Sequence, residues 1–379
     1  WETYRQYGDI QLLQEHYPAM KRYVDFLETK IDPQTGILNE GPLGDWLSPE
    51  GNKNDNTLFW MSYYAYDLDI LSQMAEALGK TADVAALNQR SANIKAKTNA
   101  VYLNEAGKTV KSGLKTGFMG APNESDSRTQ SEKGNMMDTQ ASYAIPLDLD
   151  IFNNANKAKA LEGLRSTITR TNVDDGGVKR PEYSLMTGFI GTASISEALS
   201  ENGADDLAYK LLTNRQYPSW LYSVVNGASS IWERLNSYTV ENGFGGNNSM
   251  NSFNHYSFGA VAAWMYNYSL GIQRDPVVPA FKSFILQPTP DPNGEITSAS
   301  GYYESMYGRI VSSWKMDKGK LSYMCIVPPN SSATLYLPAK SISQITESGE
   351  PIGKWAGVAV SGTKVMIPLG SGVYDFVVQ

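Results

Sequence analysis

The sequence predicts a mainly helical domain followed by a smaller antiparallel β-sandwich. Apolar residues recur at three- and four-residue steps up to about residue 272, which is the period of an amphipathic helix. Beyond Pro276 the sequence changes to short alternating runs separated by Pro and Gly turns, which are typical of strands. We therefore expect a helical domain over residues 1–275 and a β-sandwich over 276–379, with Pro276 and Pro279 stiffening the link.

The helical domain is expected to contain about eight helices joined by loops of unequal length. The first residues resemble the end of a helix, and Pro18 suits the first turn of the next one. The clearest pattern covers residues 57–78, where Gly79 supplies a C-terminal cap. The polar stretch 108–135 is long enough to be a functional or mobile loop. Further helices are expected at 84–101, 138–149, 157–168, 188–199, 204–212 and 253–270.

The C-terminal part predicts a β-hairpin with strands over 310–316 and 321–327. Cys325, the only cysteine, lies in the second of these strands, where the alternation favours a buried structural thiol over a nucleophile. A single cysteine also rules out an intrachain disulfide. Further strands are expected at 333–337, 364–369 and 373–378.

The composition argues against several classes of function. The net charge is −7 and no Lys/Arg run occurs, so we expect no nucleic-acid partner. One cysteine and two histidines leave little for a zinc site. No apolar stretch approaches the roughly 18 residues of a membrane span, and no signal peptide is present. Because Trp1 is not a natural start, we expect the chain to be part of a longer or processed protein. The sequence does not settle the compartment; a periplasmic or extracellular location is favoured, and a cytoplasmic one stays open.

Three loop segments carry the residues best suited to chemistry, because loop residues on a helical scaffold are better candidates than periodic ones. The first places Trp46 beside Asp45, the second places Glu233 beside Trp232, and the third supplies His255, one of only two histidines. A carboxylate with a nearby imidazole and aromatic walls suits a neutral, hydroxyl-rich substrate. The sequence therefore points to a sugar.

Each candidate also has an ordinary structural explanation. Trp46 could plug the end of the helical core, and Glu233 could form a salt bridge with Arg234. A hydrogen-bonded core histidine is the usual explanation for a residue such as His255. A large core is the preferred explanation for most of the many aromatic residues.

Cleavage of a glycosidic bond normally requires two carboxyl groups, of which one protonates the leaving oxygen and the other activates water or attacks. Glu233 can serve as one of them. Asp45, Asp138 and Glu182 are available for the other role, but none has a distinguishing context.

Several motifs occur in a fixed order along the chain, and Trp-Glu-Arg followed by Asn-His-Tyr is a fairly specific pair. They are YRQYGD at 4–9, HYPAM at 16–20, GDWL at 44–47, YPSWLY at 217–222, GASSIWER at 227–234 and FNHYSFG at 253–259. With these motifs the chain resembles, over essentially its whole length, the catalytic and C-terminal regions of bacterial α-L-rhamnosidases of glycoside hydrolase family 78.

The resemblance implies an (α/α)6 barrel followed by a β-sandwich, and hydrolysis of terminal α-L-rhamnosides with inversion. It matches Glu233 to the general base, His255 to a sugar-contacting histidine and Trp46 to an aromatic wall. We expect Asp45 and Trp232 to bind substrate as well.

The family's general acid is a glutamate upstream of the region where this chain starts. We therefore expect the acid on an upstream segment. We also expect a barrel lacking its first helices, since about eight helices fall short of six pairs.

Two other functions stay open. A polysaccharide lyase would use His255 and Tyr256 to abstract a proton, although Lys and Arg are sparse around the aromatic loops. A non-catalytic carbohydrate-binding protein would use the same aromatic platforms, with Glu233 only as a hydrogen-bond acceptor. The expected partner is a rhamnose-containing oligosaccharide or glycoside, and no cofactor is implied. A calcium ion in a loop stays open because such sites leave weak sequence traces. The aglycone, linkage and oligomeric state are not encoded in a readable way.

Overall fold

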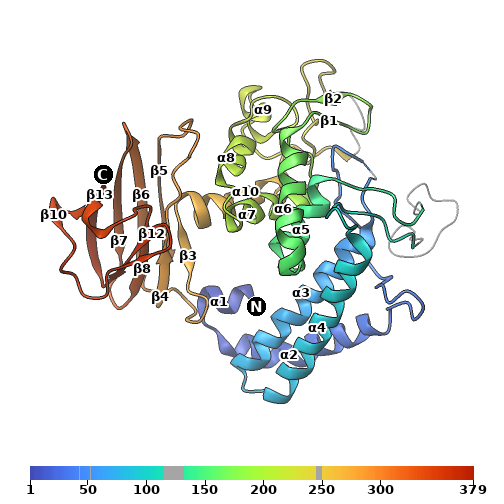
Figure 1. Cartoon of the computed structure of the whole chain (residues 1–379), viewed down its shortest axis with the longest axis horizontal. Coiled ribbons are helices and arrows are strands. Elements are labelled where there is room, and N and C mark those ends of the chain that lie inside the picture. The colour runs from blue at the N-terminus through green and yellow to red at the C-terminus, as the bar shows by residue number, and fades with distance from the viewer. Residues whose placement is uncertain (42, 52, 115–131, 245–249) are drawn as a thin grey trace. The chain divides into compact units, whose positions relative to one another are not determined.

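The computed structural model describes residues 1–41, 43–51, 53–114, 132–244 and 250–379 (Figure 1). It confirms the predicted succession of a helical region and a β region. Contacts between residues divide the chain into two compact units: one comprises residues 14–261, and the other joins residues 1–13 to 262–379. Part of the predicted loop 108–135, residues 115–131, lies outside the described residues.

The helical unit is built largely from pairs of consecutive helices. α3 packs against α4 and α5 against α6, while α3, α5 and α7 also contact one another in that order. The N-terminal ends of these three helices therefore belong to neighbouring elements. The helices are α2 (Ile10–Glu28), α3 (Asn56–Ala77), α4 (Thr81–Tyr102), α5 (Gln140–Asp148), α6 (Asn154–Thr169), α7 (Phe189–Glu201), α8 (Asp205–Thr213) and α9 (Trp220–Val225).

Most of the predicted helices are confirmed. The pattern over 57–78 corresponds to α3, whose end is marked by Gly79 with a φ of +70°. The prediction that Pro18 opens a helix is wrong, because Pro18 lies inside α2. Helix α2 tolerates it since residues 14 and 18 are both exposed, so water can solvate the carbonyl that loses its partner.

The end of the helical region differs most from the prediction. The expected helix over 253–270 is wrong in its first part, where the main-chain N–H of His255 donates to the carbonyl of Ile231. Helical structure begins only with η3 (Ser257–Ala260), followed by α10 (Val261–Trp264) and the π-helical η4 (Met265–Ser269). The short helix α9, capped by the Ser219 hydroxyl, escaped prediction because six residues show no clear period. With α1 (Glu2–Tyr7), the described residues form ten α-helices.

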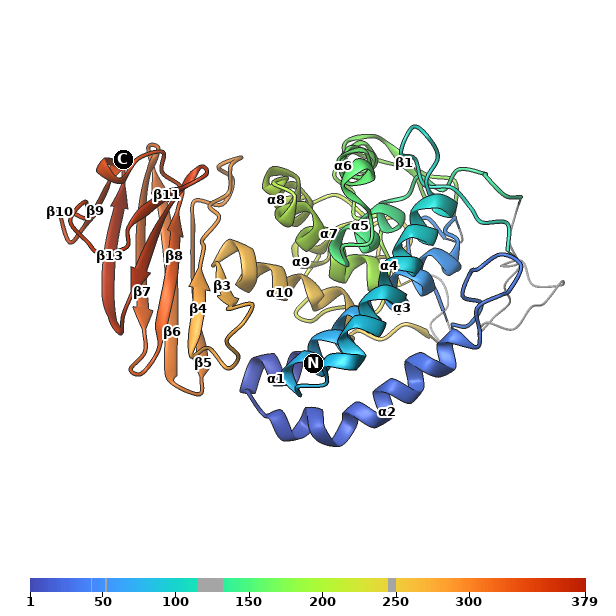
Figure 2. The same cartoon turned by 60° about the horizontal axis from the view of Figure 1, so that its bottom comes forward.

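The second unit contains two packed sheets, in the strand orders β10-β9-β13-β7-β6-β5 and β11-β12-β8-β4-β3 (Figure 2). The predicted hairpin is confirmed as β6 (Gly308–Asp317) and β7 (Lys320–Val327). One pair, β4 with β8, is parallel, which departs from the expected all-antiparallel arrangement. The other strands are β3 (Ile272–Arg274), β4 (Ser283–Leu286), β5 (Ser298–Ser305), β8 (Ser332–Leu337), β9 (Ile345–Glu347), β10 (Glu350–Pro351), β11 (Ala359–Ser361), β12 (Lys364–Leu369) and β13 (Gly372–Val378).

The sandwich core is apolar and includes the single cysteine. Trp314, Phe284 and Tyr323 are fully buried in it. Cys325 is buried beside them, and burial raises the pKa of its thiol far above the usual range. The thiol therefore stays protonated, as the prediction of a structural cysteine requires.

Candidate active site

Three acidic residues fasten the loop between α2 and α3 to three helix ends. We call the described residues of 39–55 the strap loop. Asp55 is the N-cap of α3, Glu50 accepts a hydrogen bond from the first backbone N–H of α5, and Asp45 accepts hydrogen bonds at the start of α7. The first N–H groups of a helix lack intrahelical partners and carry partial positive charge, so a carboxylate is stabilised there. The strap loop is thereby held against the N-terminal ends of three neighbouring helices.

Asp45 is held most closely. Its Oδ2 accepts from the N–H of Gly188 at 2.7 Å, and its Oδ1 accepts from the N–H of Gly191 at 2.8 Å. The residue is only 8 % exposed, and burial raises the pKa of its carboxyl to about 6 in spite of these backbone hydrogen bonds. Both carboxylate oxygens face α7. Asp45 is not among the residues that line the pocket of about 530 Å³ next to Trp46, which is described below. The sequence-based expectation that Asp45 contacts substrate directly finds no support in this geometry.

Trp46 and His255 are linked through one phenylalanine. The carbonyl of Trp46 accepts from the N–H of Phe189 at 2.9 Å. The Phe189 ring lies 4.9 Å from the His255 imidazole, centroid to centroid, and meets Phe258 edge-on at 5.4 Å. Two motifs more than 200 residues apart in the sequence are therefore connected through one residue, Phe189, whose backbone contacts Trp46 and whose ring contacts His255.

Glu233 and His255 lie on two segments that are hydrogen-bonded to each other. The N–H of Glu233 donates to the carbonyl of Ser252, and its Oε2 accepts from the Ser252 N–H, both at 2.8 Å. The N–H of His255 donates to the carbonyl of Ile231, also at 2.8 Å. This pairing brings the Trp-Glu-Arg and Asn-His-Tyr motifs together, which sequence spacing alone left undecided.

The alternative role of Glu233 as a salt-bridge partner of Arg234 is not what the structure shows. Arg234 instead donates through Nε to the carbonyl of Met250 at 2.9 Å. Within the described residues no ion pair joins Glu233 to Arg234, and Oε1 of Glu233 has no hydrogen-bond donor. Among the residues that the structure describes, one oxygen of this half-buried carboxylate therefore accepts no hydrogen bond.

Trp232 has a structural environment. It is 8 % exposed, and its ring meets Phe253 at 5.5 Å and Tyr238 at 6.4 Å, both edge-on. Phe244 closes this aromatic cluster by contacting Tyr238 and Phe253. Trp232 thus supports the backbone that carries Glu233 and has little free surface for a sugar.

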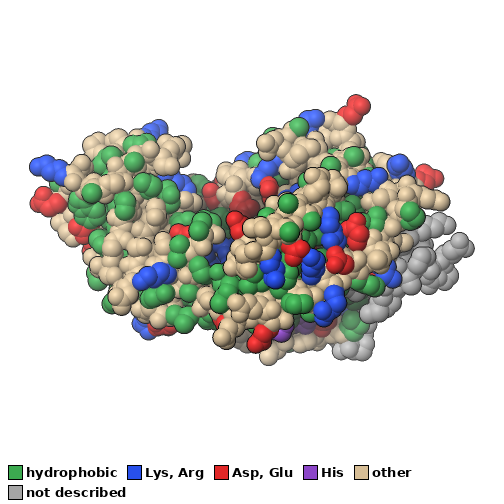
Figure 3. Space-filling view, turned by 90° about the horizontal axis from the view of Figure 1, so that it is seen from below, with side chains coloured by type: hydrophobic (Ala, Val, Ile, Leu, Met, Phe, Trp, Pro, Cys, Tyr) green, Lys and Arg blue, Asp and Glu red, His purple; other side chains and the backbone are tan. Residues whose placement is uncertain are grey.

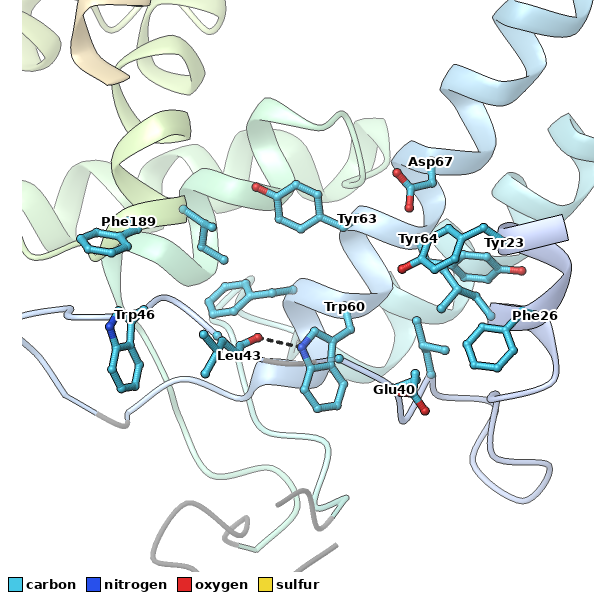
Figure 4. A pocket seen from close by; sticks show the side chains of 16 residues that line it. Tyr23, Phe26, Glu40, Leu43, Trp46, Trp60, Tyr63, Tyr64, Asp67 and Phe189 are labelled. Carbon is cyan, nitrogen blue, oxygen red and sulfur yellow. Dashed lines mark hydrogen bonds between the residues drawn. The ribbon is translucent and has the colours of Figure 1, made fainter. Parts of the chain in front are cut away.

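A pocket of about 530 Å³ adjoins Trp46 and Phe189 (Figure 4). Half of its lining residues are aromatic, and Figure 4 shows Trp46 and Phe189 toward one end and Tyr23 and Phe26 toward the other. The lining residues are Tyr23, Phe26, Leu27, Leu38, Glu40, Gly41, Leu43, Gly44, Trp46, Phe59, Trp60, Tyr63, Tyr64, Asp67, Phe189 and Ile190. Such a wall with a few polar groups suits the apolar faces and hydroxyl groups of a sugar.

Asp67 is one of the lining residues that sequence analysis missed. It has no hydrogen-bond or ion-pair partner within the described residues, and burial raises the pKa of its carboxyl to about 6. Asp67 follows Tyr63 by one turn of α3, and both line the pocket (Figure 4). An acidic residue within a long helix gives no sequence signal of this kind, because a solvated helix face looks the same.

The described residues contain no group of three or more His, Cys, Asp or Glu side chains that could hold a metal ion. None of the helices in the described part of the chain is long and apolar enough to cross a membrane.

On the face shown in Figure 3, acidic and basic side chains are intermixed and do not form separate acidic and basic patches.

Comparison with known proteins identifies the class. Residues 1–269 match the model of the bacterial α-L-rhamnosidase six-hairpin glycosidase domain, and residues 271–351 match that of the bacterial α-L-rhamnosidase C-terminal domain. The fold is therefore that of the six-hairpin glycosidases, which agrees with the expected (α/α)6 barrel. The chain belongs to the bacterial α-L-rhamnosidase family.

Individual relatives agree with this assignment. The chain is 31% identical to an α-L-rhamnosidase of Formosa agariphila over 99% of its length, and 30% identical to one of Streptomyces avermitilis over 100%. It superposes on the structure of the Streptomyces avermitilis enzyme complexed with L-rhamnose with a TM-score of 0.80 at 27% identity, covering 99% of this chain and 32% of that one. For the enzyme of Dictyoglumus thermophilum the TM-score is 0.79 at 28% identity, with 100% and 38% covered. The chain spans 37% and 32% of the two curated relatives, roughly a third of their length.

Proposed function

We propose that the protein hydrolyses terminal α-L-rhamnosides with inversion, and that Glu233 is the general base. The observation that supports this proposal is the backbone pairing of the segment of Glu233 with the segment of Ser252 and His255, which puts the two candidate residues on neighbouring segments. His255 in turn contacts Phe189, a wall of the aromatic pocket. An inverting base must hold a water molecule on the side opposite the leaving group, and Oε1 of Glu233 is available for that water.

The other residues act as walls and supports. We propose that Trp46 stacks on the apolar face of the sugar and that the His255 imidazole forms a hydrogen bond with a sugar hydroxyl. Asp45 and Trp232, expected from the sequence to bind substrate, would contribute by holding Trp46 and Glu233 in place. The partner is accordingly a rhamnose-containing glycoside.

We propose that the general acid comes from a part of the protein outside residues 1–379. Two of the three carboxyl groups considered from the sequence, Asp45 and Asp138, are poorly suited to the role. Asp45 is occupied by backbone donors. Although burial opposes it, hydrogen bonds from Tyr143, Arg170 and Lys108 hold the pKa of Asp138 below its usual value, so Asp138 stays ionised. A general acid must instead be protonated at the working pH.

The experiment that tests the proposal is Glu233→Gln in the full-length protein. Hydrolysis of an aryl α-L-rhamnoside should fall by about a thousandfold, because general-base catalysis is lost, while the affinity for rhamnose should change little. Glu241→Gln is the matched control, since Glu241 is exposed and lies nearby in the sequence. A Glu233→Gln protein that keeps its rate would refute the assignment of the base.

The same assays separate the two alternatives. If the protein only binds carbohydrate, the unsubstituted protein would bind rhamnose but would not hydrolyse the aryl α-L-rhamnoside. A lyase would generate an absorbing double bond from a uronate, but the described pocket lining contains no Lys or Arg to hold such a substrate.

A further inference from the structure

We propose that Asp45 is a positioning residue. By holding the strap loop against the first turn of α7, it fixes the position of Trp46 relative to His255. The contact between Asp45 and the start of α7 does not depend on the function proposed above. The effect of this contact on catalysis rests on that function.

The contact engages consecutive backbone donors of α7. Asp45 accepts from Gly188, Ile190 and Gly191, while the carbonyl of Trp46 accepts from Phe189. The N–H groups at the start of α7 are thus satisfied by two adjacent strap-loop residues, so the loop and the helix end form one unit.

The two glycines show how closely the surfaces approach. A Cβ atom added to Gly188 would lie 2.2 Å from the carbonyl oxygen of Trp46, and one added to Gly191 would lie 2.9 Å from Oδ2 of Asp45. Neither glycine has a positive φ. Glycine is therefore required at Gly188 by the closeness of the loop backbone rather than by its own conformation.

The consequence reaches His255 through the Phe189 ring. The N–H of Phe189 donates to the carbonyl of Trp46, and the Phe189 ring contacts the His255 imidazole. A shift of the helix end relative to the strap loop would therefore displace both proposed sugar contacts. Removing the Asp45 carboxylate should loosen this connection even though Asp45 itself is not among the pocket-lining residues.

Glu50 provides a matched control. It is 5 % exposed, lies five residues further along the same loop, and accepts from the backbone of Gln140 at the start of α5. It has no hydrogen bond to Trp46 or Phe189 among the described residues. Glu50→Gln therefore perturbs the same kind of buried helix cap without touching the connection between Trp46 and His255.

The test compares Asp45→Asn with Glu50→Gln in the full-length protein labelled with 5-fluorotryptophan. The ¹⁹F resonance of Trp46, assigned with Trp46→Phe, reports on the position of the indole. We expect Asp45→Asn to shift or split this resonance and to lower kcat/KM for an aryl rhamnoside about tenfold or more. Glu50→Gln should leave the resonance unchanged and kcat/KM within about twofold, even where both variants lower Tm.

Two results would overturn the proposal: an unmoved Trp46 resonance in Asp45→Asn, or an equal displacement in Glu50→Gln. If Asp45→Asn does not fold, Asp45→Ser replaces it, because a serine hydroxyl still accepts one N–H at a helix start. The resonance can be read in a parent that does not cleave rhamnosides. Absence of turnover would therefore count against the proposed function and leave the positioning role to be decided by the spectrum.

Discussion

At the scale of single residues, the two histidines of the chain have contrasting environments. His16 is exposed on α2, whereas His255 is half-buried and its ring contacts the rings of Phe189 and Tyr256. Its Nδ1 lies 3.4 Å from the N–H of Ser257. The ring is thus oriented by two aromatic neighbours and a backbone N–H, as expected of a group that makes one specific hydrogen bond to a ligand.

This contrast gives a direct prediction. His255→Gln should weaken rhamnose binding by about 1–2 kcal/mol, roughly tenfold in Kd, because a hydrogen bond and a stacked ring are lost. His16→Gln should leave Kd unchanged. Titration calorimetry with rhamnose measures both, and equal affinities for the two variants would exclude His255 from the binding site.

At the scale of elements, the junction between the strap loop and α7 depends on Gly188. Gly188→Ala would place a methyl group against the backbone oxygens of Trp46 and Asp45, at 2.2 and 2.5 Å. A backbone cannot yield as a flexible side chain does. We expect a loss of about 3 kcal/mol in the free energy of unfolding.

Gly176→Ala is the control for that substitution, because its nearest neighbour to an added Cβ is Oδ1 of Asp174 at 3.4 Å, an ordinary contact. It should change the free energy of unfolding by less than about 1 kcal/mol. Urea denaturation compares the two variants. A Gly188→Ala protein as stable as the parent would mean that the loop does not rest on α7 as described.

At the scale of the whole molecule, the helical unit buries several carboxyl groups that are costly to ionise. Burial is the largest cause of the raised pKa of Asp45, Glu50, Asp67 and Asp148. For Asp148 the value is about 8, since Glu197 and Glu201 add like charge while a hydrogen bond from Ser194 opposes the rise. In the unfolded chain an aspartate titrates near pH 4.

These raised values fix the direction of the pH dependence. Between about pH 4 and pH 8 the folded state binds the Asp148 proton that the unfolded state has lost, so this contribution to stability declines as the pH rises. Asp148→Asn removes the titrating group. Its stability relative to the parent should therefore increase by about 3 kcal/mol between pH 5 and pH 8.

Thermal unfolding at the two pH values measures this difference. Asp150→Asn is the control, because the Asp150 side chain is 74% exposed and pairs with Lys157 at 3.1 Å. A parallel pH response of parent and Asp148→Asn would show that Asp148 is not buried in the folded protein.

The sequence by itself determined the order of the two parts, most of the helices, the β6–β7 hairpin and the motifs that mark the family. Local period, caps and turn residues are short-range properties, and they are legible in a single chain. Trp46, Glu233 and His255 could be chosen as candidates because rare residue types in loops stand out from a periodic background.

Only the tertiary structure decided what these residues touch. The pairing of Glu233 with Ser252, the contacts of Phe189 with Trp46 and His255, and the capping of α7 by Asp45 all join separate segments of the chain. Pro18 inside α2 and the burial of Asp67 in the pocket wall could not be predicted for the same reason. The burial of a residue and its hydrogen-bond partners depend on the packing of the whole helical unit. A local sequence pattern does not show which distant backbone segment will contact that residue.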